Sequence, residues 1–264
     1  MKRLASLTTC FFLIAAVVAS AQEAGKGKIV GKFIIEEGRT MSGGSVFFFN
    51  DATGPRPSEE RYWRVPDAVA PMGEDGQFSI ELPPGKYYIG AIKRISAEKN
   101  FGPPEEGDYF FKGQDGRGNP TPYFVKKGET TDIGTLSVGS SFKRAVVKYA
   151  DGITAVEGVV LDSEGKPVEG VAVFGYKKAA MRGRPLFTSD KTGQDGKYIL
   201  RVHEGGKYYL RVRDVYGGGP PVGGAIVGGY WQEGPVEASV QTGEVRKGID
   251  IKVMRLSGKG PKKE

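Results

Sequence analysis

The chain has 264 residues, 38 Lys and Arg against 31 Asp and Glu, and a formal net charge of +7 at pH 7. Its only cysteine, Cys10, lies near the start, which excludes disulfides, thiolate metal sites, cysteine nucleophiles and C-x-x-C-H haem attachment in the rest of the chain. The length suits two ordinary domains. The mild positive charge favours acidic glycans, anionic surface groups or acidic proteins as partners, and no long Lys/Arg run points to nucleic acid.

Residues 1–21 have the pattern of a secretory signal peptide. Lys2 and Arg3 precede an apolar run that ends at Val18, and a small-x-small cleavage site follows. The unbroken apolar stretch is shorter than the roughly 18 to 20 residues of a spanning helix. We expect cleavage before Gln22, no membrane span in the mature chain, and a periplasmic, outer-surface or extracellular location. A retained N-terminal anchor is the alternative.

The remainder of the chain reads as two copies of one pattern. Gly31 aligns with Gly158 at an offset of 127, and the next glycines and a Val-Phe pair coincide at the same offset. Residues 72–82 match 192–202 at an offset of 120, and residues 85–89 match 206–210 at an offset of 121. A fourth block aligns Gly128-Glu129 with Gly243-Glu244. Four blocks in one order indicate a duplication.

The blocks have the period of β-strands. Within 197–202 and 207–212, apolar residues alternate with mostly polar ones, as they do when one face of a strand is buried. Asp75-Gly76 and Asp195-Gly196 each precede such a strand and have the chemistry of a tight hairpin turn. No stretch shows apolar residues at helical spacing, and the 41 glycines and 16 prolines fit the many turns of an all-β protein.

The second copy follows one ordered motif over nearly its whole length: Gly158-Val159-Val160, Asp162, Gly165, Pro167-Val168, Gly170-Val171, Val173, Thr192, Asp195-Gly196, Tyr198, Gly206, Tyr208, Leu210 and Val212. This order resembles the carboxypeptidase regulatory-like domain, which is related in fold to transthyretin-like and starch-binding-like sandwiches. The first copy departs from it, with Thr40 in place of the proline, Ile35 in place of the aspartate, and longer loops. The resemblance implies a Greek-key sandwich that serves as an accessory or binding module and has no catalytic residue.

We therefore predict an all-β chain with two tandem antiparallel Greek-key β-sandwich domains of the prealbumin-like type. The first spans 26–139 and the second 154–256, with the connection at 140–153 between them. A basic tail at 257–264 follows.

The residue types needed for catalysis do not form a recognisable constellation. His203 is the only histidine and falls in a turn between two predicted strands. The carboxylate pairs at 59–60 and 105–106 are the candidates for glycoside cleavage, but such pairs are common on surfaces. We therefore predict no enzyme, no catalytic residue and no cofactor.

Two acidic loops are the candidates for calcium. One carries Asp108, Asp115 and Asn119, and the other runs over 162–164. Neither has the ligand spacing that wraps a chain around the ion, and Asp or Asn before Gly more often makes a turn. We predict no metal site.

The long connections carry the candidate binding residues. The 50–71 connection and its counterpart in the second copy are both basic. Tyr62 and Trp63 have no counterpart in the second copy, whereas Tyr123-Phe124 and Tyr230-Trp231 occupy equivalent places and are expected to fold inward. The predicted partner-binding residues are Arg61, Tyr62, Trp63, Arg64, Arg182 and Arg184.

These features together predict a non-catalytic exported binding or assembly module that contacts a protein or polysaccharide at the cell envelope or surface. One alternative is a structural subunit of a surface layer, filament or complex, in which exposed sheet edges pair with neighbours. Another is a carbohydrate-binding accessory protein. The sequence leaves the partner and the oligomeric state open.

Overall fold

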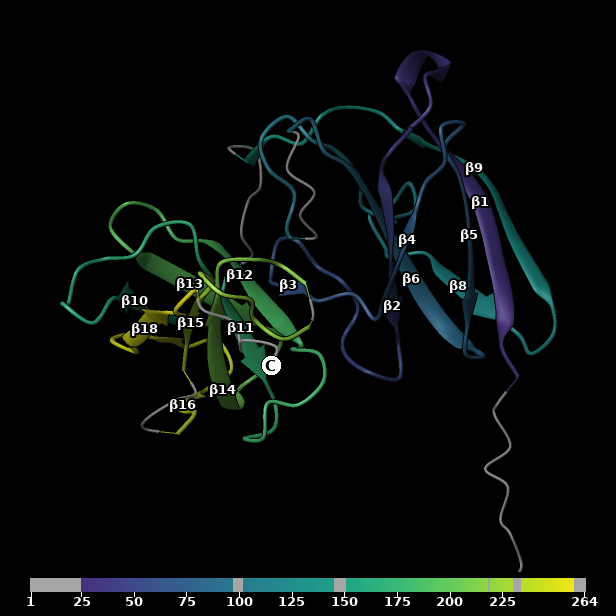
Figure 1. The fold of residues 1–264 in the computed structure, drawn as a ribbon. Coiled ribbons are helices and arrows are strands. Elements are labelled where there is room, and N and C mark those ends of the chain that lie inside the picture. The colour runs from purple at the N-terminus through teal and green to yellow at the C-terminus, as the bar shows by residue number, and fades with distance from the viewer. Residues whose placement is uncertain (1–24, 97–101, 145–150, 218, 230–233, 259–264) are drawn as a thin grey trace, which may run out of the picture.

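The structure, a computed structural model, describes residues 25–96, 102–144, 151–217, 219–229 and 234–258. The expected signal peptide at 1–21, the Tyr230-Trp231 pair and residues 259–264 of the tail lie outside the described residues. Two lobes lie side by side (Figure 1). We call the chain from β1 to β9 the N-terminal half and the chain from β10 to β18 the C-terminal half, and of the first half β3 lies against the lobe of the second. The described residues contain no α-helix, and one 3-10 turn spans Glu36–Gly38, which confirms the predicted all-β class.

The N-terminal half consists of two sheets that enclose one core. One sheet has the strand order β5-β1-β9, and the other has the order β4-β2-β6-β7 with β8 also paired to β6. Phe33, Phe48 and Tyr87 are among the largest fully buried side chains between them. The strands are β1 (Gly27–Ile35), β2 (Ser45–Asn50), β3 (Trp63–Arg64), β4 (Ala68–Pro71), β5 (Gln77–Leu82), β6 (Gly85–Lys93), β7 (Tyr109–Phe111), β8 (Pro122–Val125) and β9 (Thr130–Val138).

The C-terminal half repeats this arrangement around its own core of Phe187, Leu200, Tyr208 and their neighbours. Its strands follow the order β13-β10-β18-β15-β14-β11-β12, with β16 paired to β14 and β17 to β10. Because β15 also pairs with β18, the two layers are continuous at that corner. The strands are β10 (Thr154–Leu161), β11 (Ala172–Tyr176), β12 (Phe187–Lys191), β13 (Lys197–Val202), β14 (Gly206–Arg213), β15 (Ile226–Gly228), β16 (Val236–Val240), β17 (Val245–Arg246) and β18 (Ile251–Arg255).

The strand registers of the two halves agree with the alignment of the two copies. Gly31 lies opposite Phe78 in the N-terminal half, and Gly158 lies opposite Tyr198 in the C-terminal half. The central pairs agree in the same way, since Val46 faces Ala91 where Val173 faces Val212. Each pair is related to its counterpart by the sequence offsets of 127, 120 and 121.

The first strand of each half makes parallel pairings, which the alternation of residues does not predict. β1 pairs with β9 in parallel, and β10 pairs with β17 and β18 in parallel, while the other named strand pairs are antiparallel. A Cβ atom on Gly158 would lie 2.0 Å from the carbonyl oxygen of Ile249, and one on Gly31 would lie 2.5 Å from Cγ1 of Ile133. The aligned glycines thus let the first strand of each half approach the last segment closely.

A tyrosine closes the same corner in both halves. The Tyr87 hydroxyl donates a 2.9 Å hydrogen bond to the carbonyl oxygen of Pro83, and the Tyr208 hydroxyl donates a 2.8 Å bond to that of Glu204. Both tyrosines are buried, and a bond back to a residue four positions earlier is a known feature of Greek-key sandwiches. The duplication therefore extends to side-chain hydrogen bonds.

Candidate binding cleft between the two halves

A segment of the N-terminal half is built into the C-terminal half. Strand β3 pairs antiparallel with β12, with Trp63 opposite Thr188 and Arg64 opposite Phe187. β3 therefore extends the sheet of the C-terminal half at the edge formed by β12. An edge strand presents unpaired backbone groups, and this segment satisfies some of them.

Tyr62 anchors the segment by entering the core of the C-terminal half. Its side chain is 3% exposed and packs edge-on against Phe187, with ring centroids 5.2 Å apart. Its hydroxyl donates a 2.6 Å hydrogen bond to the carbonyl oxygen of Arg56. His203 lies 5.4 Å from the same ring, exposed in the turn between β13 and β14, where the sequence predicts it.

The predicted site residues separate into buried and exposed groups. Tyr62, Trp63 and Arg64 are buried, because the neighbouring half absorbs the segment that carries them, so they are not a solvent-exposed patch. Arg61, Arg182 and Arg184 are exposed. Contact of any of the six with a partner stays a prediction.

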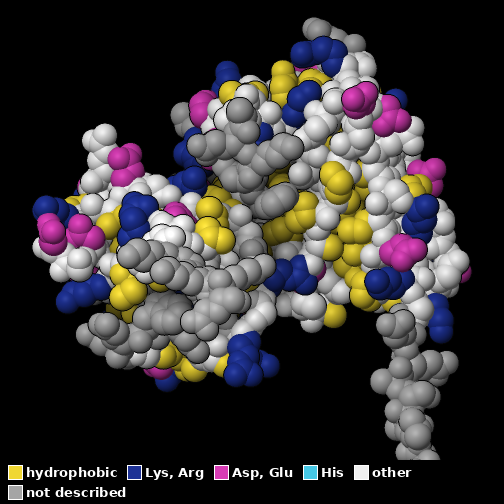
Figure 2. Space-filling view, in the orientation of Figure 1, with side chains coloured by type: hydrophobic (Ala, Val, Ile, Leu, Met, Phe, Trp, Pro, Cys, Tyr) yellow, Lys and Arg dark blue, Asp and Glu magenta, His cyan; other side chains and the backbone are white. Residues whose placement is uncertain are grey.

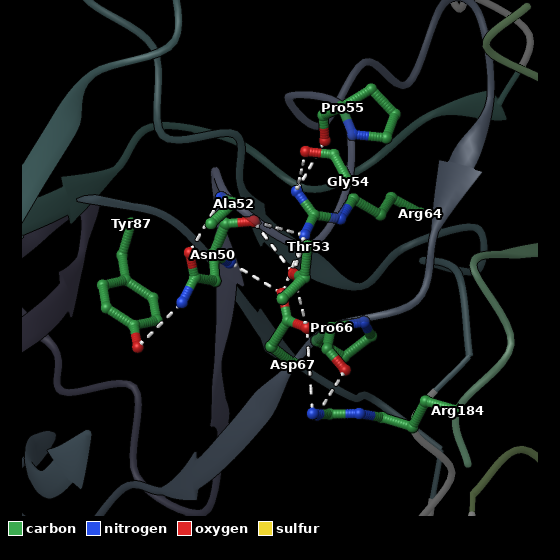
Figure 3. A network of polar contacts seen from close by, with 10 residues as sticks. All are labelled: Asn50, Ala52, Thr53, Gly54, Pro55, Arg64, Pro66, Asp67, Tyr87 and Arg184. Carbon is green, nitrogen blue, oxygen red and sulfur yellow. Dashed lines mark hydrogen bonds and ion pairs between the residues drawn. The ribbon is translucent and has the colours of Figure 1, made fainter. Parts of the chain in front are cut away.

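Arg64 organises the loop that leads into β3 (Figure 3). Its guanidinium donates to the carbonyl oxygens of Asn50, Gly54 and Pro55 and to the hydroxyl of Thr53. It also forms a 2.7 Å ion pair with Asp67. Burial lowers the pKa of the Arg64 guanidinium and the Asp67 carboxylate opposes that shift, so the group stays a cation.

Arg184 of the C-terminal half completes this network from the other side. It lies 3.7 Å from the carboxylate of Asp67 and donates a 3.0 Å hydrogen bond to the carbonyl oxygen of Pro66. Of the predicted site residues, the structure thus brings Arg64 and Arg184 together on one carboxylate.

Further ties hold the halves together around this loop. Arg201 of β13 donates a 2.9 Å hydrogen bond to the carbonyl oxygen of Glu59, and the Glu59 carboxylate pairs with Lys112. Arg144 forms a 2.9 Å ion pair with Asp190 of the C-terminal half.

Tyr216 fills the space beside Gly102. A Cβ atom on Gly102 would lie 2.3 Å from the Tyr216 ring, and the Tyr216 hydroxyl donates to the carbonyl oxygen of Ser189. Burial raises the pKa of the Tyr216 hydroxyl. This aromatic side chain therefore belongs to the contact between the halves.

A cavity of about 510 Å³ lies between the halves. Its walls come from the outer faces of β2 and β6 on one side and of β11 and β14 on the other, with β3 also lining it. Hydrophobic side chains are visible beside the hollow between the lobes in Figure 2. The aromatic side chains in its lining include Phe47, Phe49, Trp63, Phe110, Phe174 and Tyr176.

The charges of the lining are unequal. Five basic side chains and two acidic ones line the cavity. The acidic side chains are Glu59 and Asp67, and both are engaged in the ion pairs described above. The basic side chains are Arg64, Lys112, Arg184, Arg211 and Arg213.

Sequence reasoning missed most of these walls. Phe47 and Phe49 lie on the face of β2 opposite the core residues Val46 and Phe48, so both faces of the strand are covered. The continuous apolar run at 46–49 is the signal that could have revealed it, because a strand with one solvent-exposed face alternates instead. Arg211 and Arg213 alternate with core residues of β14 and carried no distinguishing signal.

The other candidate residues have structural roles. Asp108 is buried and pairs with Arg94 at 2.5 Å, while Asp115 and Asp162 accept hydrogen bonds from backbone N–H groups of their own turns. No group of three or more His, Cys, Asp or Glu suited to a metal occurs in the part of the chain that the structure describes. Tyr123 packs against the core as expected, but Phe124 is 59% exposed.

No protein-family model matches the chain, and no curated protein matches it by sequence. Among solved structures it is similar to the Bacillus anthracis TIE protein, with 14% identity, a TM-score of 0.25, and coverage of 88% of this chain and 34% of that one. A streptococcal ancillary pilin is 12% identical with a TM-score of 0.27, and the match covers 88% of this chain and 63% of that one. The minor pilin of Streptococcus agalactiae is 12% identical with a TM-score of 0.24, and the match covers 90% of this chain and 100% of that one. The chain thus spans less than two thirds of the first two structures. At these TM-scores the likenesses carry no argument about function.

No helix among the described residues has the length and apolar character needed to cross a bilayer.

Proposed function

We propose that this protein is an exported, non-catalytic binding module that holds a partner of the cell envelope or surface in the cleft between its two halves. The observation that carries the proposal is the cavity of about 510 Å³ between two aromatic sheet faces. Binding pockets have volumes of roughly 300 to 1,000 Å³, mostly apolar walls and a few convergent polar groups, and this cavity has all three properties.

The connection between the halves supports the proposal. Tyr62, β3 and the Arg201 bond to Glu59 join the halves at one side of the cavity. Preorganised walls lower the cost of ordering on binding, so a cleft held in this way suits a binding protein. The halves are proposed to be carboxypeptidase regulatory-like modules over 26–139 and 154–256, which the shared registers support.

A blocked cleft tests the function. Val69 lies in the cavity wall on β4, so Val69→Trp fills the cavity, whereas Val222 is 73% exposed and outside the lining, so Val222→Trp is the matched control. Envelope extracts are passed over the immobilised mature chain and both variants, and the retained partners are compared. We expect the wild type and Val222→Trp to retain the same partner and Val69→Trp to lose it. Equal retention by all three would exclude the cleft as the binding site.

A further inference from the structure

The hydrogen-bonding groups in the cavity walls are mainly donors. Among the described residues, three lining side chains have a buried N–H without an acceptor: Nε1 of Trp63, Nε of Arg64 and Nε of Arg213. Trp63 is 9% exposed. Buried donors are rarely left unpaired, since a buried N–H without an acceptor has lost its hydrogen bond to water and gained none in return. The walls therefore favour a ligand that brings acceptors.

The acceptors of the cavity are already occupied for the most part. Asp67 pairs with Arg64 and Arg184, and one oxygen of Glu59 pairs with Lys112. The second oxygen of Glu59 is the one buried side-chain acceptor of the lining without a partner among the described residues. A ligand rich in hydroxyl donors would find few free carboxylate oxygens here, which favours an anionic ligand over a neutral sugar.

Arg213 supplies a positive charge that no carboxylate neutralises in the described part of the chain. It lies at the end of β14, and its guanidinium donates a 3.2 Å hydrogen bond to the carbonyl oxygen of Gly219. No ion pair of Arg213 occurs among the described residues. A guanidinium with donors to spare binds a carboxylate strongly, because such bonds are charge-assisted.

Much of the remaining lining is aromatic. Phe47, Phe49 and Phe110 from one half face Phe174 and Tyr176 from the other half across the cavity. Enclosed aromatic walls of this kind gain free energy from apolar surface at about 25 cal/mol per Å² and gain nothing from hydroxyls. An apolar body combined with an anionic acceptor matches both features of the cavity.

We propose that the cleft takes an amphiphilic carboxylate, an aliphatic chain that ends in a carboxylate, with the chain between the phenyl walls and the carboxylate at Arg213 and Trp63. This ligand class rests on the proposed function, since it concerns the same cleft. An acidic peptide or an acidic glycan is an outcome of the test below.

The experiment varies the head group on one chain. Decanoate, decan-1-ol and decylammonium are titrated into the mature protein below their aggregation concentrations, with calorimetry and tryptophan fluorescence as readouts. The chain has two tryptophans, so a Trp231→Phe background assigns the fluorescence change to Trp63. We expect decanoate to bind about tenfold or more tightly than decan-1-ol, as a charged hydrogen bond is worth about 1.5 to 3 kcal/mol, and decylammonium to bind most weakly.

A matched pair of variants locates the carboxylate. Arg213→Gln removes the guanidinium charge from the cavity wall. Arg255 also donates to a single backbone carbonyl, that of Gly224, but lies outside the lining, so Arg255→Gln removes a comparable charge elsewhere. Arg213→Gln is expected to weaken decanoate about tenfold and to leave decan-1-ol unchanged, and Arg255→Gln to change neither. Trp63→Phe replaces the indole with a phenyl ring and so removes the N–H, and in calorimetry it is expected to weaken decanoate more than decan-1-ol.

Several results would overturn the assignment. Equal affinities for the three head groups, or equal effects of the two arginine variants, would show that the cleft does not recognise a carboxylate at Arg213. If an acidic peptide or an oligogalacturonate binds more tightly than decanoate and this binding is lost in Arg213→Gln, the ligand is that acidic polymer and not an aliphatic carboxylate. Failure of every probe, while Val69→Trp still abolishes partner retention, would refute the ligand class and leave the proposed function standing.

Discussion

The guanidinium of Arg201 donates a hydrogen bond to the carbonyl oxygen of Glu59, 142 residues earlier in the chain, over 2.9 Å. Arg201 is 2% exposed, and its guanidinium lies 5.5 Å from the Trp63 ring. One side chain of the C-terminal half therefore fixes both the carbonyl and the indole of the segment that the N-terminal half inserts.

Replacing Arg201 tests how much this tie stabilises the protein. Arg201→Met keeps much of the side-chain volume and leaves the Glu59 carbonyl without its donor, so the free energy of unfolding should fall by about 1 to 3 kcal/mol. Urea denaturation measures it. Arg246 is exposed on β17, and Arg246→Met should change the same quantity by less than about 0.5 kcal/mol. Equal losses would mean that the buried bond contributes nothing of its own.

Tyr62 belongs to one half by sequence and to the other by packing, and its truncation should reveal that. Tyr62→Ala empties part of the C-terminal core, so we expect a loss of about 3 to 5 kcal/mol, the range for truncating a buried aromatic. Amide hydrogen exchange should accelerate first at Phe187 and Thr188 of β12, which pair with β3.

A tyrosine that packs within its own half is the control for Tyr62→Ala. Tyr123 packs against the N-terminal core, so Tyr123→Ala should leave exchange in β12 unchanged. Acceleration in β12 with Tyr123→Ala, or none with Tyr62→Ala, would contradict the assignment of Tyr62 to the C-terminal core.

The Tyr62 phenol also makes the stability of the protein depend on pH. Burial raises its pKa from the ordinary value of 10 to about 12, although Arg64 and Arg61 oppose the shift. Because the folded pKa is the higher one, the stabilisation is complete below pH 10 and is lost as the pH rises from 10 to 12.

Tyr62→Phe separates this ionisation from that of the other buried tyrosines. The variant loses the hydrogen bond to Arg56, so it should be about 1 kcal/mol less stable at pH 8. It lacks the ionisable group, and its stability should therefore decline less between pH 10 and pH 12. The denaturant midpoints of the wild type and of Tyr62→Phe should therefore converge between pH 10 and pH 12. If the two midpoints instead fall in parallel with pH, Tyr62 does not titrate in this range.

The repeat and the inward-facing positions of its strands were predictable from the sequence because they depend on local patterns. Strand alternation and the Asp-Gly turns fix which residues face inward, and one set of offsets relates Gly31–Phe78 to Gly158–Tyr198. The parallel pairing of β1 with β9 has no such local signal, because it depends on how distant segments meet after folding.

The cleft could not be predicted for the same reason. Tyr62 and Trp63 lack a counterpart in the second copy, which marked them as special but did not distinguish contact with an external partner from contact with the other half. Arg213 sits on a strand face that looks solvent-exposed when one half is considered alone, and only the approach of the second half makes it a wall.

Asp67 is the carboxylate at the centre of the polar network in the inserted loop. Its carboxylate accepts the Asn50 backbone N–H and the Thr53 hydroxyl, and it pairs with the guanidinium groups of Arg64 and Arg184, one from each half. The Arg64 side chain is 1% exposed, so losing its anionic partner leaves a buried cation. Breaking a buried ion pair in this way lowers the free energy of unfolding by about 3 to 5 kcal/mol. Because Arg64 keeps four carbonyl and hydroxyl acceptors, we expect Asp67→Asn to lose about 3 kcal/mol, the lower end of that range.

Asp75→Asn is the control for this change. Asp75 is exposed and accepts the Gln77 N–H within its own turn, so its replacement should cost less than about 1 kcal/mol. Urea denaturation gives both free energies, and amide exchange at Trp63 and Arg64 shows whether β3 detaches. Because Asp67 holds Arg64 and Arg184 in the cavity wall, Asp67→Asn should also weaken partner retention, whereas Asp75→Asn should not. Equal stability losses from the two variants would refute the role of Asp67 as the bridge between the halves.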